Sequence, residues 1–226
     1  MEVYVWSLRY NDYISPDNII KDWSVLCWSA KWLFEPTVYG AKVAGKEAIA
    51  RQDISILSAM WKLLDQADIV VVQNGKKFDI PKLNTRFLLA GLPPPSHYLV
   101  VDTKQVATKV FTFSSNKLDY MNKILGIKGK EDMEMQDWVD CVHGDEKALA
   151  KMLAYNKDDT VIMEELYLRL RPWIPGHPNL GIYADLDQDC CPACQSTELK
   201  WGGQKKRAGA TIFIERAPAR FRRQRE

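Results

Sequence analysis

The sequence predicts an α/β layer fold, and three features of its pattern lead to this prediction. Runs of aromatic and β-branched residues near the N-terminus indicate two strands. Helical and strand patterns then alternate through the middle of the chain, and a long helical pattern follows them. With 226 residues, of which 46% are hydrophobic, the chain can bury a substantial core. We expect a main domain over residues 1–175 and an appendage over residues 176–226.

The N-terminal half begins with two expected strands, Val3–Tyr10 and Trp23–Trp32, separated by the turn-forming residues "NDYISPDN". Residues 45–68 place apolar side chains at helical spacing and predict one amphipathic helix of about four turns. Ile69–Val72 follows at once. Four consecutive β-branched residues favour a strand that is buried on both faces.

The second half continues the alternation. A helix is expected from Asp79 up to Gly91, which precedes three prolines. The residues "YLVVD" predict a short strand that ends at Asp102, and "NKLDYMNKILG" predicts a short helix. The last helix runs from residue 145 to residue 172, with a break expected near Tyr155.

Charge is distributed unevenly along the chain. The net charge is +2, but residues 200–226 hold nine Lys or Arg against two acids, and the first 199 residues hold 22 basic and 27 acidic groups. A basic tail is either a contact for phosphate backbones or a solvated terminus. No apolar run approaches the roughly 20 residues of a membrane span, and no secretory signal is evident. We expect a cytoplasmic protein.

Five cysteines complete the composition. Cys27 and Cys141 lie among apolar neighbours, which is typical of packing residues. Cys191 and Cys194 form a CxxC pair with Cys190 just before it, as in the first knuckle of a zinc ribbon. A closed zinc site needs two more ligands, and no Cys or His follows. We therefore expect no zinc in the monomer, whereas a zinc ion shared by a dimer remains an alternative.

Polar residues that could do chemistry follow the predicted strands. In open α/β sheets, ligands bind beyond the carboxyl ends of the strands. Asn74 to Asp79 lies there for one strand, and Asp102 for the next. On the last helix, Tyr155 and Asp159 are four residues apart and share a face. Each acid also has an ordinary interpretation, since Asp79 could cap its helix for about 1 kcal/mol and Asp158 with Asp159 could form a solvated face.

Two of these segments resemble motifs of a known family. Asn74-Gly-Lys-Lys-Phe-Asp79 and Tyr155-Asn-Lys-Asp-Asp159 are similar to the second and third motifs of the DEDD 3′-to-5′ exonucleases, in the subgroup with tyrosine in the third motif. The surroundings, including "LCWSAKWL" and "LRLRPWIPGHPN", are similar to standalone predicted exonucleases of bacteria and phages. The resemblance covers about residues 3–195. It implies a ribonuclease H-like mixed sheet flanked by helices.

The resemblance also implies a chemistry. Family members use four carboxylates to hold two Mg²⁺ or Mn²⁺ ions at the scissile phosphate. Asp79 and Asp159 are then expected as metal ligands, and Tyr155 is expected to orient the attacking water.

Other residues around these motifs are expected to assist. Asn74, Lys76 and Lys77 are candidates for contacts with a nucleic-acid strand, and Phe78 either stacks on a base or packs in the core. Asp102 and Asp158 are expected to support the metal ligands from behind. The expected partner is single-stranded DNA or the 3′ end of a nucleic acid, with RNA as an alternative.

The family's first motif, Asp-x-Glu on a central strand, has no counterpart in this chain. It should lie just before "VYVWSLR", where only Met1 and Glu2 stand. We expect that Met1 is an internal methionine taken as the start, or that the gene is truncated. The neighbouring strand edges are then either exposed or paired with each other. We expect the chain as it stands to be inactive. The alternatives are a catalytically dead nucleic-acid-binding module and an unstable fragment.

Overall fold

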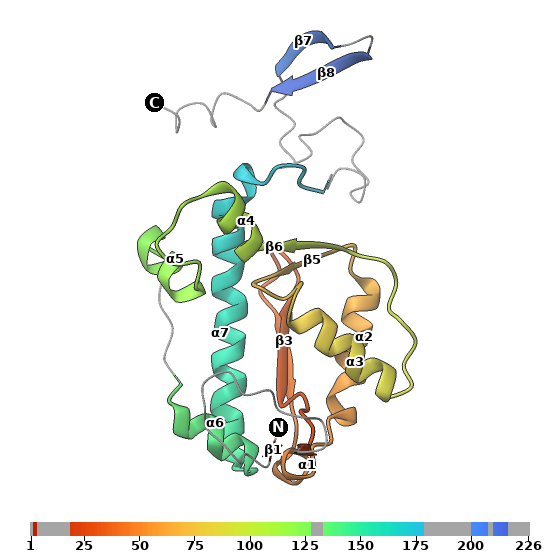
Figure 1. Ribbon diagram of the computed structural model, residues 1–226, viewed down its shortest axis with the longest axis vertical. Helices are drawn as coiled ribbons and strands as arrows, with labels where there is room; N and C mark the ends of the chain where they lie inside the picture. The colour runs from red at the N-terminus through yellow and green to blue at the C-terminus, as the bar shows by residue number, and fades with distance from the viewer. Residues whose placement is uncertain (1, 4–18, 128–132, 179–199, 208–209, 217–226) are drawn as a thin grey trace.

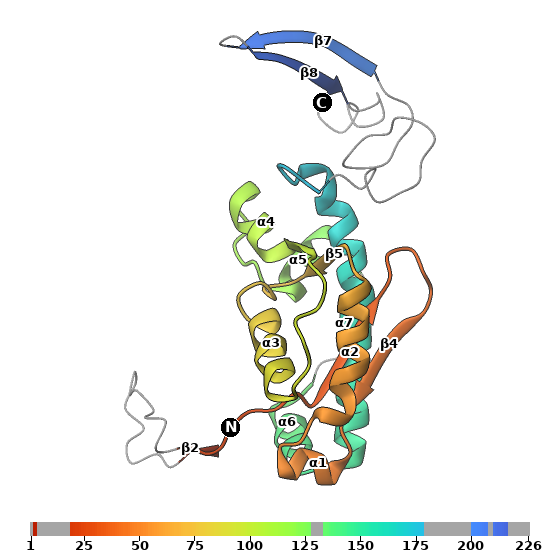
Figure 2. The ribbon, with the colours of Figure 1, turned by 90° about the vertical axis from the view of Figure 1, so that its right-hand side faces the viewer.

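The computed structural model describes residues 2–3, 19–127, 133–178, 200–207 and 210–216. Helices flank several two-stranded sheets, and one long helix, α7 (Glu146–Leu170), runs beside the strands through most of the main body (Figure 1). Viewed at right angles, α3, α4 and α5 lie toward one face of the molecule, and β4 lies toward the opposite face (Figure 2). This arrangement confirms a mixed α/β fold with small sheets and flanking helices.

The N-terminal part of the chain contributes four described strands. β1 (Glu2–Val3) pairs antiparallel with β2 (Ile19–Lys21), and the remainder of the expected strand Val3–Tyr10 lies outside the described residues. β3 covers only Cys27–Lys31 and pairs antiparallel with β4 (Val38–Lys42). The expected strand Trp23–Trp32 was therefore too long, because its first residues form an irregular segment before the sheet begins.

The segment after β4 is two helices rather than the single one that was expected. α1 (Gly45–Ala50) ends at Arg51, whose φ of 58° lies in the left-handed region, and α2 covers Ile54–Gln66. Asp53 lies in the break with 0% exposure. Its carboxylate accepts a hydrogen bond from the Val25 amide at 2.8 Å and pairs with Arg86 Nη2 at 2.6 Å. These contacts explain why the helix is interrupted at this point.

The middle of the chain contains the parallel strands that position the site. β5 (Ile69–Val72) pairs in parallel with β6 (Leu99–Asp102), and α3 (Asp79–Leu89) connects them. These three elements match the sequence prediction. α4 (Thr103–Val110), which the pattern did not indicate, starts directly after β6.

The C-terminal helices complete the main body. α5 (Leu118–Leu125) ends at Gly126, as expected, and α6 (Met135–Val142) precedes α7. The break expected near Tyr155 is wrong, because α7 continues for 25 residues without interruption. A short 3-10 helix, η2 (Arg171–Trp173), follows it. The polar residues around Tyr155 are therefore one turn of a continuous helix that faces a cleft.

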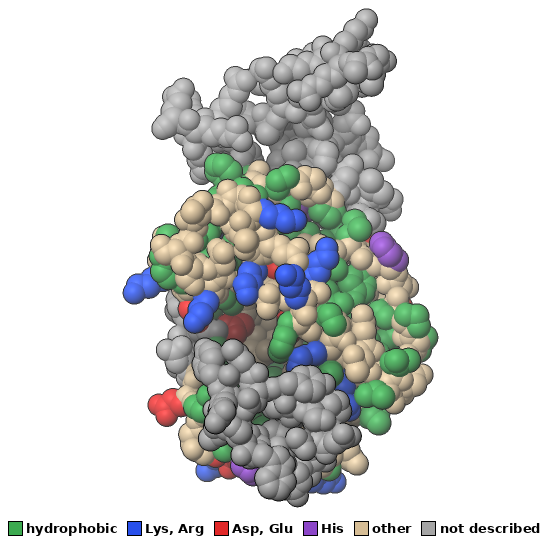
Figure 3. All heavy atoms as spheres, viewed as in Figure 1, with side chains coloured by type: hydrophobic (Ala, Val, Ile, Leu, Met, Phe, Trp, Pro, Cys, Tyr) green, Lys and Arg blue, Asp and Glu red, His purple; other side chains and the backbone are tan. Residues whose placement is uncertain are grey.

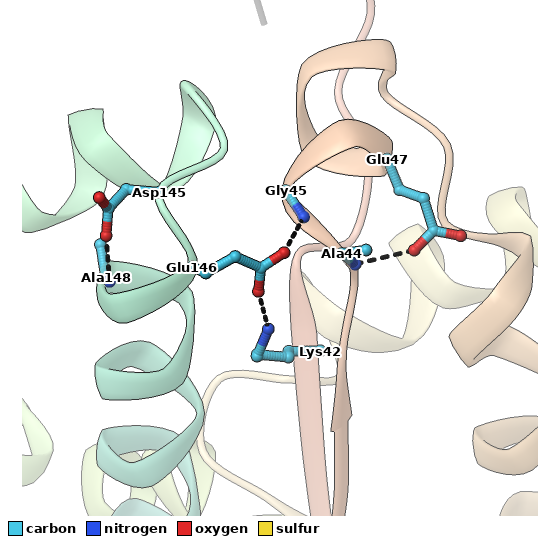
Figure 4. Close-up of polar contacts among 7 residues, drawn as sticks. All are labelled: Lys42, Ala44, Gly45, Glu47, Asp145, Glu146 and Ala148. Atoms are coloured by element: carbon cyan, nitrogen blue, oxygen red, sulfur yellow. Dashed lines mark hydrogen bonds and ion pairs between the residues drawn. The ribbon is translucent and has the colours of Figure 1, made fainter.

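Polar contacts fasten the start of α7 to the β4–α1 corner (Figure 4). Asp145 caps α7 by accepting the Ala148 amide at 2.8 Å. Glu146 accepts the Gly45 amide at 2.5 Å and also pairs with Lys42. These contacts fix where α7 begins, and hence which of its side chains face the strands.

Three apolar clusters form the core. The largest joins β3, α1, α2, α6 and α7 and includes Trp28, whose indole N–H donates to the Ile56 carbonyl at 2.8 Å. Cys141 is fully buried there and Cys27 packs against it. Burial raises the pKa of the Cys27 thiol to about 12 and that of Cys141 to about 11. Both cysteines therefore stay protonated and act as packing residues, as the sequence predicts.

The basic tail contains a hairpin of β7 (Lys200–Arg207) and β8 (Ala210–Arg216). The CxxC pair Cys191 and Cys194 lies outside the described residues. In the part of the chain that the structure describes, no helix has both the length and the hydropathy that a membrane span requires.

Candidate functional site

A cleft of about 940 Å³ lies between β3 and β5, and its walls are completed by α2, α3 and α7. Among the described residues, β3 pairs only with β4 and β5 only with β6. The edges of β3 and β5 that border the cleft are therefore not hydrogen-bonded to each other. The sequence left open whether these edges are exposed or paired with each other. In the structure they are not paired with each other.

Three residues that the sequence marked for chemistry line this cleft together. Asp79 reaches it from α3, and Tyr155 and Asp159 reach it from α7. Tyr155 and Asp159 are half-buried, and Asp79 is more exposed. Residues that lie 76 positions apart in the chain, Asp79 and Tyr155, are thus brought to one cavity.

Neighbouring acids on α7 differ in their placement. Asp159 lines the cleft, whereas Asp158 is exposed and is absent from its walls. One step along a helix turns a side chain by about 100°, which accounts for this difference. A supporting role for Asp158 stays a prediction.

The contact between β3 and α7 is polar at the level of this site. The Ser29 hydroxyl donates to the Asn156 carbonyl at 2.8 Å and lies 2.6 Å from the Thr160 hydroxyl. Lys31 pairs with Glu164 Oε2 at 2.6 Å one turn further along. These contacts hold the face of α7 that carries Tyr155 and Asp159 toward the cleft.

The turn between β5 and α3 has an unusual backbone. Asn74 adopts a φ of 64°, a left-handed conformation that asparagine tolerates better than most residues. Gly75 follows and is buried, and its carbonyl accepts the Ile80 amide at 2.9 Å. A Cβ on Gly75 would lie 2.7 Å from Val72 Cβ and 3.0 Å from Asp79 Oδ2. The "Asn-Gly" pair therefore makes room for the Asp79 carboxylate.

Asp79 does not cap its helix. The N-cap position of α3 belongs to Phe78, no side chain caps it, and Asp79 is the first helical residue. Although the residue is exposed at the cleft, surrounding protein atoms remove part of its hydration, and this effect raises the pKa of its carboxyl group above the ordinary value. A hydrogen bond from the backbone of Asp79 itself lowers this pKa in part, the charge of Asp102 raises it, and the charge of Lys82 lowers it. The capping interpretation is wrong, and the carboxylate faces the cleft.

Asp102 performs the capping that Asp79 does not. It is 4% exposed. Its Oδ1 accepts the amides of Asn74 at 2.9 Å, Lys104 at 3.0 Å and Gln105 at 3.3 Å, and its Oδ2 accepts the Lys76 amide at 3.2 Å. Asp102 therefore ties the β5–α3 turn to the start of α4. Its effect on the site is electrostatic, through the pKa of Asp79.

Of the residues expected to contact nucleic acid, Phe78 lines the cleft, whereas Asn74, Lys76 and Lys77 lie in the turn before it and are absent from the cleft walls. Lys76 and Lys77 are exposed. Phe78 is 52% exposed and lines the cleft, so the alternative that it packs in the core is wrong. Lys and Arg side chains gather across the middle and upper part of the face that α3, α4 and α5 share (Figure 3). Exposed lysines of these elements and their loops include Lys109, Lys117 and Lys123.

The carboxylates of Asp79 and Asp159 are the right kind of ligand for a divalent metal, but two carboxylates are too few for two ions. Carboxylate oxygens suit Mg²⁺ and Mn²⁺. Within the described ranges, however, no group of three or more His, Cys, Asp or Glu side chains lies close enough to hold an ion. Two carboxylates do not supply the ligands that two ions need, so the described residues do not fit a two-ion centre.

Several residues of the site were not found from the sequence. Trp23, Lys82, Asn156 and Thr160 line the cleft, and Gly75 lies beneath Asp79. Lys82 lies three residues after Asp79, which is the helical spacing that could have revealed it. The sequence holds no such signal for Trp23. Its position depends on tertiary contacts, because Asp53 at the start of α2 accepts hydrogen bonds from the nearby Val25 amide and from Arg86 of α3.

Comparison with known proteins gives one result. A family model described as the RNase H superfamily matches residues 40–171. The matched region runs from β4 to the end of α7, and it contains Asp79, Tyr155 and Asp159. No curated protein matches the chain.

Proposed function

Because the chain belongs to the RNase H superfamily, a group of nuclease-type proteins whose substrate is nucleic acid, we propose that its cleft binds the single-stranded 3′ ends of DNA. The reaction of this site is 3′-to-5′ exonucleolytic hydrolysis of phosphodiester bonds. RNA ends are the second candidate substrate. The observation that carries the proposal is that Asp79, Tyr155 and Asp159 all line the same cleft.

Each of these side chains has a role in the proposal. Asp79 and Asp159 supply oxygen ligands toward a divalent ion, which when bound offsets the charge of the scissile phosphate. Tyr155 orients the attacking water. Lys76 and Lys77, exposed in the turn between β5 and α3, contact phosphates, and Asn74 shapes that turn.

The same proposal includes a low rate of hydrolysis for this chain. Two carboxylates are too few to hold two divalent ions, and the family's first motif would supply the other two. A nucleic-acid-binding module without catalysis is the second candidate function. The observation that favours it is that no group of three potential metal ligands lies within the described residues.

Among the described residues, the edges of β3 and β5 that border the cleft are not paired, and this suggests how activity could be restored. A short strand between them would find backbone partners on both sides and would place alternate side chains in the cleft. If that strand carried Asp-x-Glu, both carboxylates would point to the same side. A version of the chain extended before Met1 by such an apolar strand is therefore expected to gain Mn²⁺-dependent hydrolysis.

A combined binding and cleavage assay tests these statements. Binding of a fluorescein-labelled single-stranded oligonucleotide is measured by anisotropy in EDTA, over a series of salt concentrations. Cleavage of 3′-labelled and 5′-labelled copies is then followed with Mn²⁺ for the chain as it stands and for the extended version. We expect salt-dependent binding by both, and release of mononucleotides from the 3′ end by the extended version.

Neighbouring acids on α7 provide a matched control. In the extended version, Asp159→Ala and Asp79→Ala are expected to lower the rate at least about 100-fold, whereas Asp158→Ala, outside the cleft, should leave it unchanged. An equal loss of cleavage rate in Asp158→Ala would contradict the proposed role of Asp159 as a metal ligand. Rapid Mn²⁺-dependent digestion by the chain as it stands, abolished by Asp79→Ala, would contradict the expected inactivity. Failure to bind any oligonucleotide at low salt would reject the nucleic-acid substrate.

A further inference from the structure

Two aromatic rings flank a lysine at the mouth of the cleft. The Lys82 ammonium lies 4.6 Å from the centroid of the Trp23 ring and 4.4 Å from the centroid of the Phe78 ring. Trp23, Phe78 and Lys82 all line the cleft that contains Asp79. The three side chains come from different parts of the chain: the segment before β3, the turn after β5, and α3.

This cluster has a rigid support. The Val25 amide donates to Asp53, and Asp53 pairs with Arg86 at 2.6 Å. Arg86 also lies under the same indole, with its Cζ 5.8 Å from the Trp23 centroid. Lys82 and Arg86 are four residues apart on α3 and therefore share the face that meets Trp23. Val25, two residues after Trp23, is thus bonded to the buried Asp53–Arg86 ion pair, and this contact fixes the backbone next to Trp23.

Packing alone does not account for the cluster. Phe78 keeps 52% of its surface exposed. A cation over an exposed ring contributes only about 0.5–1 kcal/mol, which is less than the roughly 1.5–3 kcal/mol gained by burying an aromatic side chain fully. An exposed aromatic ring beside a cleft is instead suited to a ligand that covers it.

The spacing of the rings fits a planar ligand. The two distances from Lys82 limit the separation of the Trp23 and Phe78 centroids to about 9 Å. A base stacked between two rings needs roughly 7 Å, which is twice the 3.4 Å repeat of stacked bases. This requirement lies below the upper limit that the two distances set, so the contacts of Lys82 are compatible with one base in the place of the ammonium group.

Lys82 has a place to go when a base enters. It lies one helical turn from Asp79, and its charge already acts on that carboxyl group. Its flexible stem lets the ammonium move toward a phosphate without any change in α3. A nucleotide supplies both groups at once, since its base replaces the cation between the rings and its phosphate pairs with that cation.

We infer that Trp23 and Phe78 form a subsite that sandwiches one unpaired base of a nucleic-acid strand, and that Lys82, which fills this subsite in the free protein, moves to the phosphate of the same nucleotide. This inference rests on the proposed function and adds a specificity to it. A base held between two rings has to be unstacked, so the cleft selects single-stranded ends over paired ones.

A chemical double-mutant cycle tests the inference without any cleavage. Two fluorescein-labelled oligothymidylates, one complete and one with an abasic residue at its 3′ end, are titrated by anisotropy in EDTA. For the unaltered chain, we expect the abasic end to weaken binding at least about fivefold, the lower end of the effect of one stacked base. Trp23→Ala should weaken binding of the complete strand by a similar factor, with no further loss for the abasic strand.

Two further variants keep the test decisive. Trp23→Phe retains a ring and is expected to preserve the preference for the complete strand. Trp173→Ala serves as the matched control, because Trp173 is 46% exposed but packs against Phe111 and does not line the cleft. An abasic penalty of equal size in Trp23→Ala and in the unaltered chain would overturn the subsite while leaving nucleic-acid binding intact. If no oligonucleotide binds at low salt, the proposed function itself fails.

Discussion

Asp79 and Asp102 follow neighbouring parallel strands, and the sequence alone makes them look equivalent. Their surroundings differ in the supply of backbone amides. Asp102 is 4% exposed and accepts four backbone N–H groups. Asp79 is exposed at the cleft, and partial loss of hydration raises the pKa of its carboxyl group. One acid holds the turn together, and the other is presented by that turn.

This difference shows why position at a strand end is not sufficient to identify a metal ligand. Backbone amides at a helix start are strong donors, and a carboxylate that satisfies several of them has few lone pairs left for an ion. A carboxylate that begins a helix without capping it has fewer amides to accept, and the backbone hydrogen bond of Asp79 comes from its own residue. The distinction lies in hydrogen bonds between segments that are 26 to 28 residues apart, and a local sequence motif does not encode it.

The largest expected effect on stability belongs to Asp102. Asp102→Ala removes the acceptor of four part-buried amides and should lower the free energy of unfolding by about 3 kcal/mol. Asp102→Asn retains one carbonyl acceptor and should lose less. Urea denaturation followed by circular dichroism measures both. Asp79→Ala is the matched control, and an equal loss in that variant would contradict the comparison.

Gly75 should give the next largest effect, because it lies between the two acids. Gly75→Ala places a Cβ 2.7 Å from Val72 Cβ and 3.0 Å from Asp79 Oδ2. The turn or the carboxylate has to shift, at a cost of about 1–3 kcal/mol. Lys76→Ala, at the exposed next position, should change stability by less than about 0.5 kcal/mol. Similar melting temperatures for Gly75→Ala and the unaltered chain would show that the turn has more room than its contacts indicate.

Much of this arrangement could be predicted from the sequence, and the exceptions share a physical cause. β5, α3, β6 and α5 follow from local patterns of apolar residues, turn residues and glycine. The interruption between α1 and α2 does not, since it depends on Arg51 in a left-handed conformation and on Asp53, whose partners Val25 and Arg86 are distant in the chain. Long-range polar contacts of Asp53 therefore decided where this helix is interrupted.

The residues of the candidate site also fall into two groups, those marked by local motifs and those whose positions depend on tertiary packing. The family resemblance marked Asp79, Tyr155 and Asp159 through short local motifs, and all three line one cleft. The roles of Asp102 and Trp23 were not found, because each depends on which segment packs beside it. Phe78 was undecided between a base and the core, and its exposure excludes the core.

The smallest expected effect concerns the pH dependence of Asp79. Its pKa in the folded protein lies above the ordinary value of 3.8, so ionisation costs more in the folded state than in the unfolded one. The resulting loss of stability is complete above the raised pKa and disappears as the pH falls to the unfolded value. Asp79→Asn removes the charge and should therefore be slightly more stable than the unaltered chain at pH 7, within about 0.5 kcal/mol, and equal to it near pH 3.

Mn²⁺ distinguishes a metal ligand from an acid that is only poorly hydrated. If Asp79 helps to hold a divalent ion, saturating Mn²⁺ at pH 7 should raise the melting temperature of the unaltered chain and leave that of Asp79→Asn unchanged, because a bound ligand stabilises only the state that binds it. Lowering the pH should remove the Mn²⁺ effect, since protons compete for the same oxygens. Asp158→Asn, which removes an exposed carboxylate outside the cleft, should retain the full response. An equal Mn²⁺ response in Asp79→Asn would place the ion elsewhere and leave the contrast between Asp79 and Asp102 as one of hydration alone.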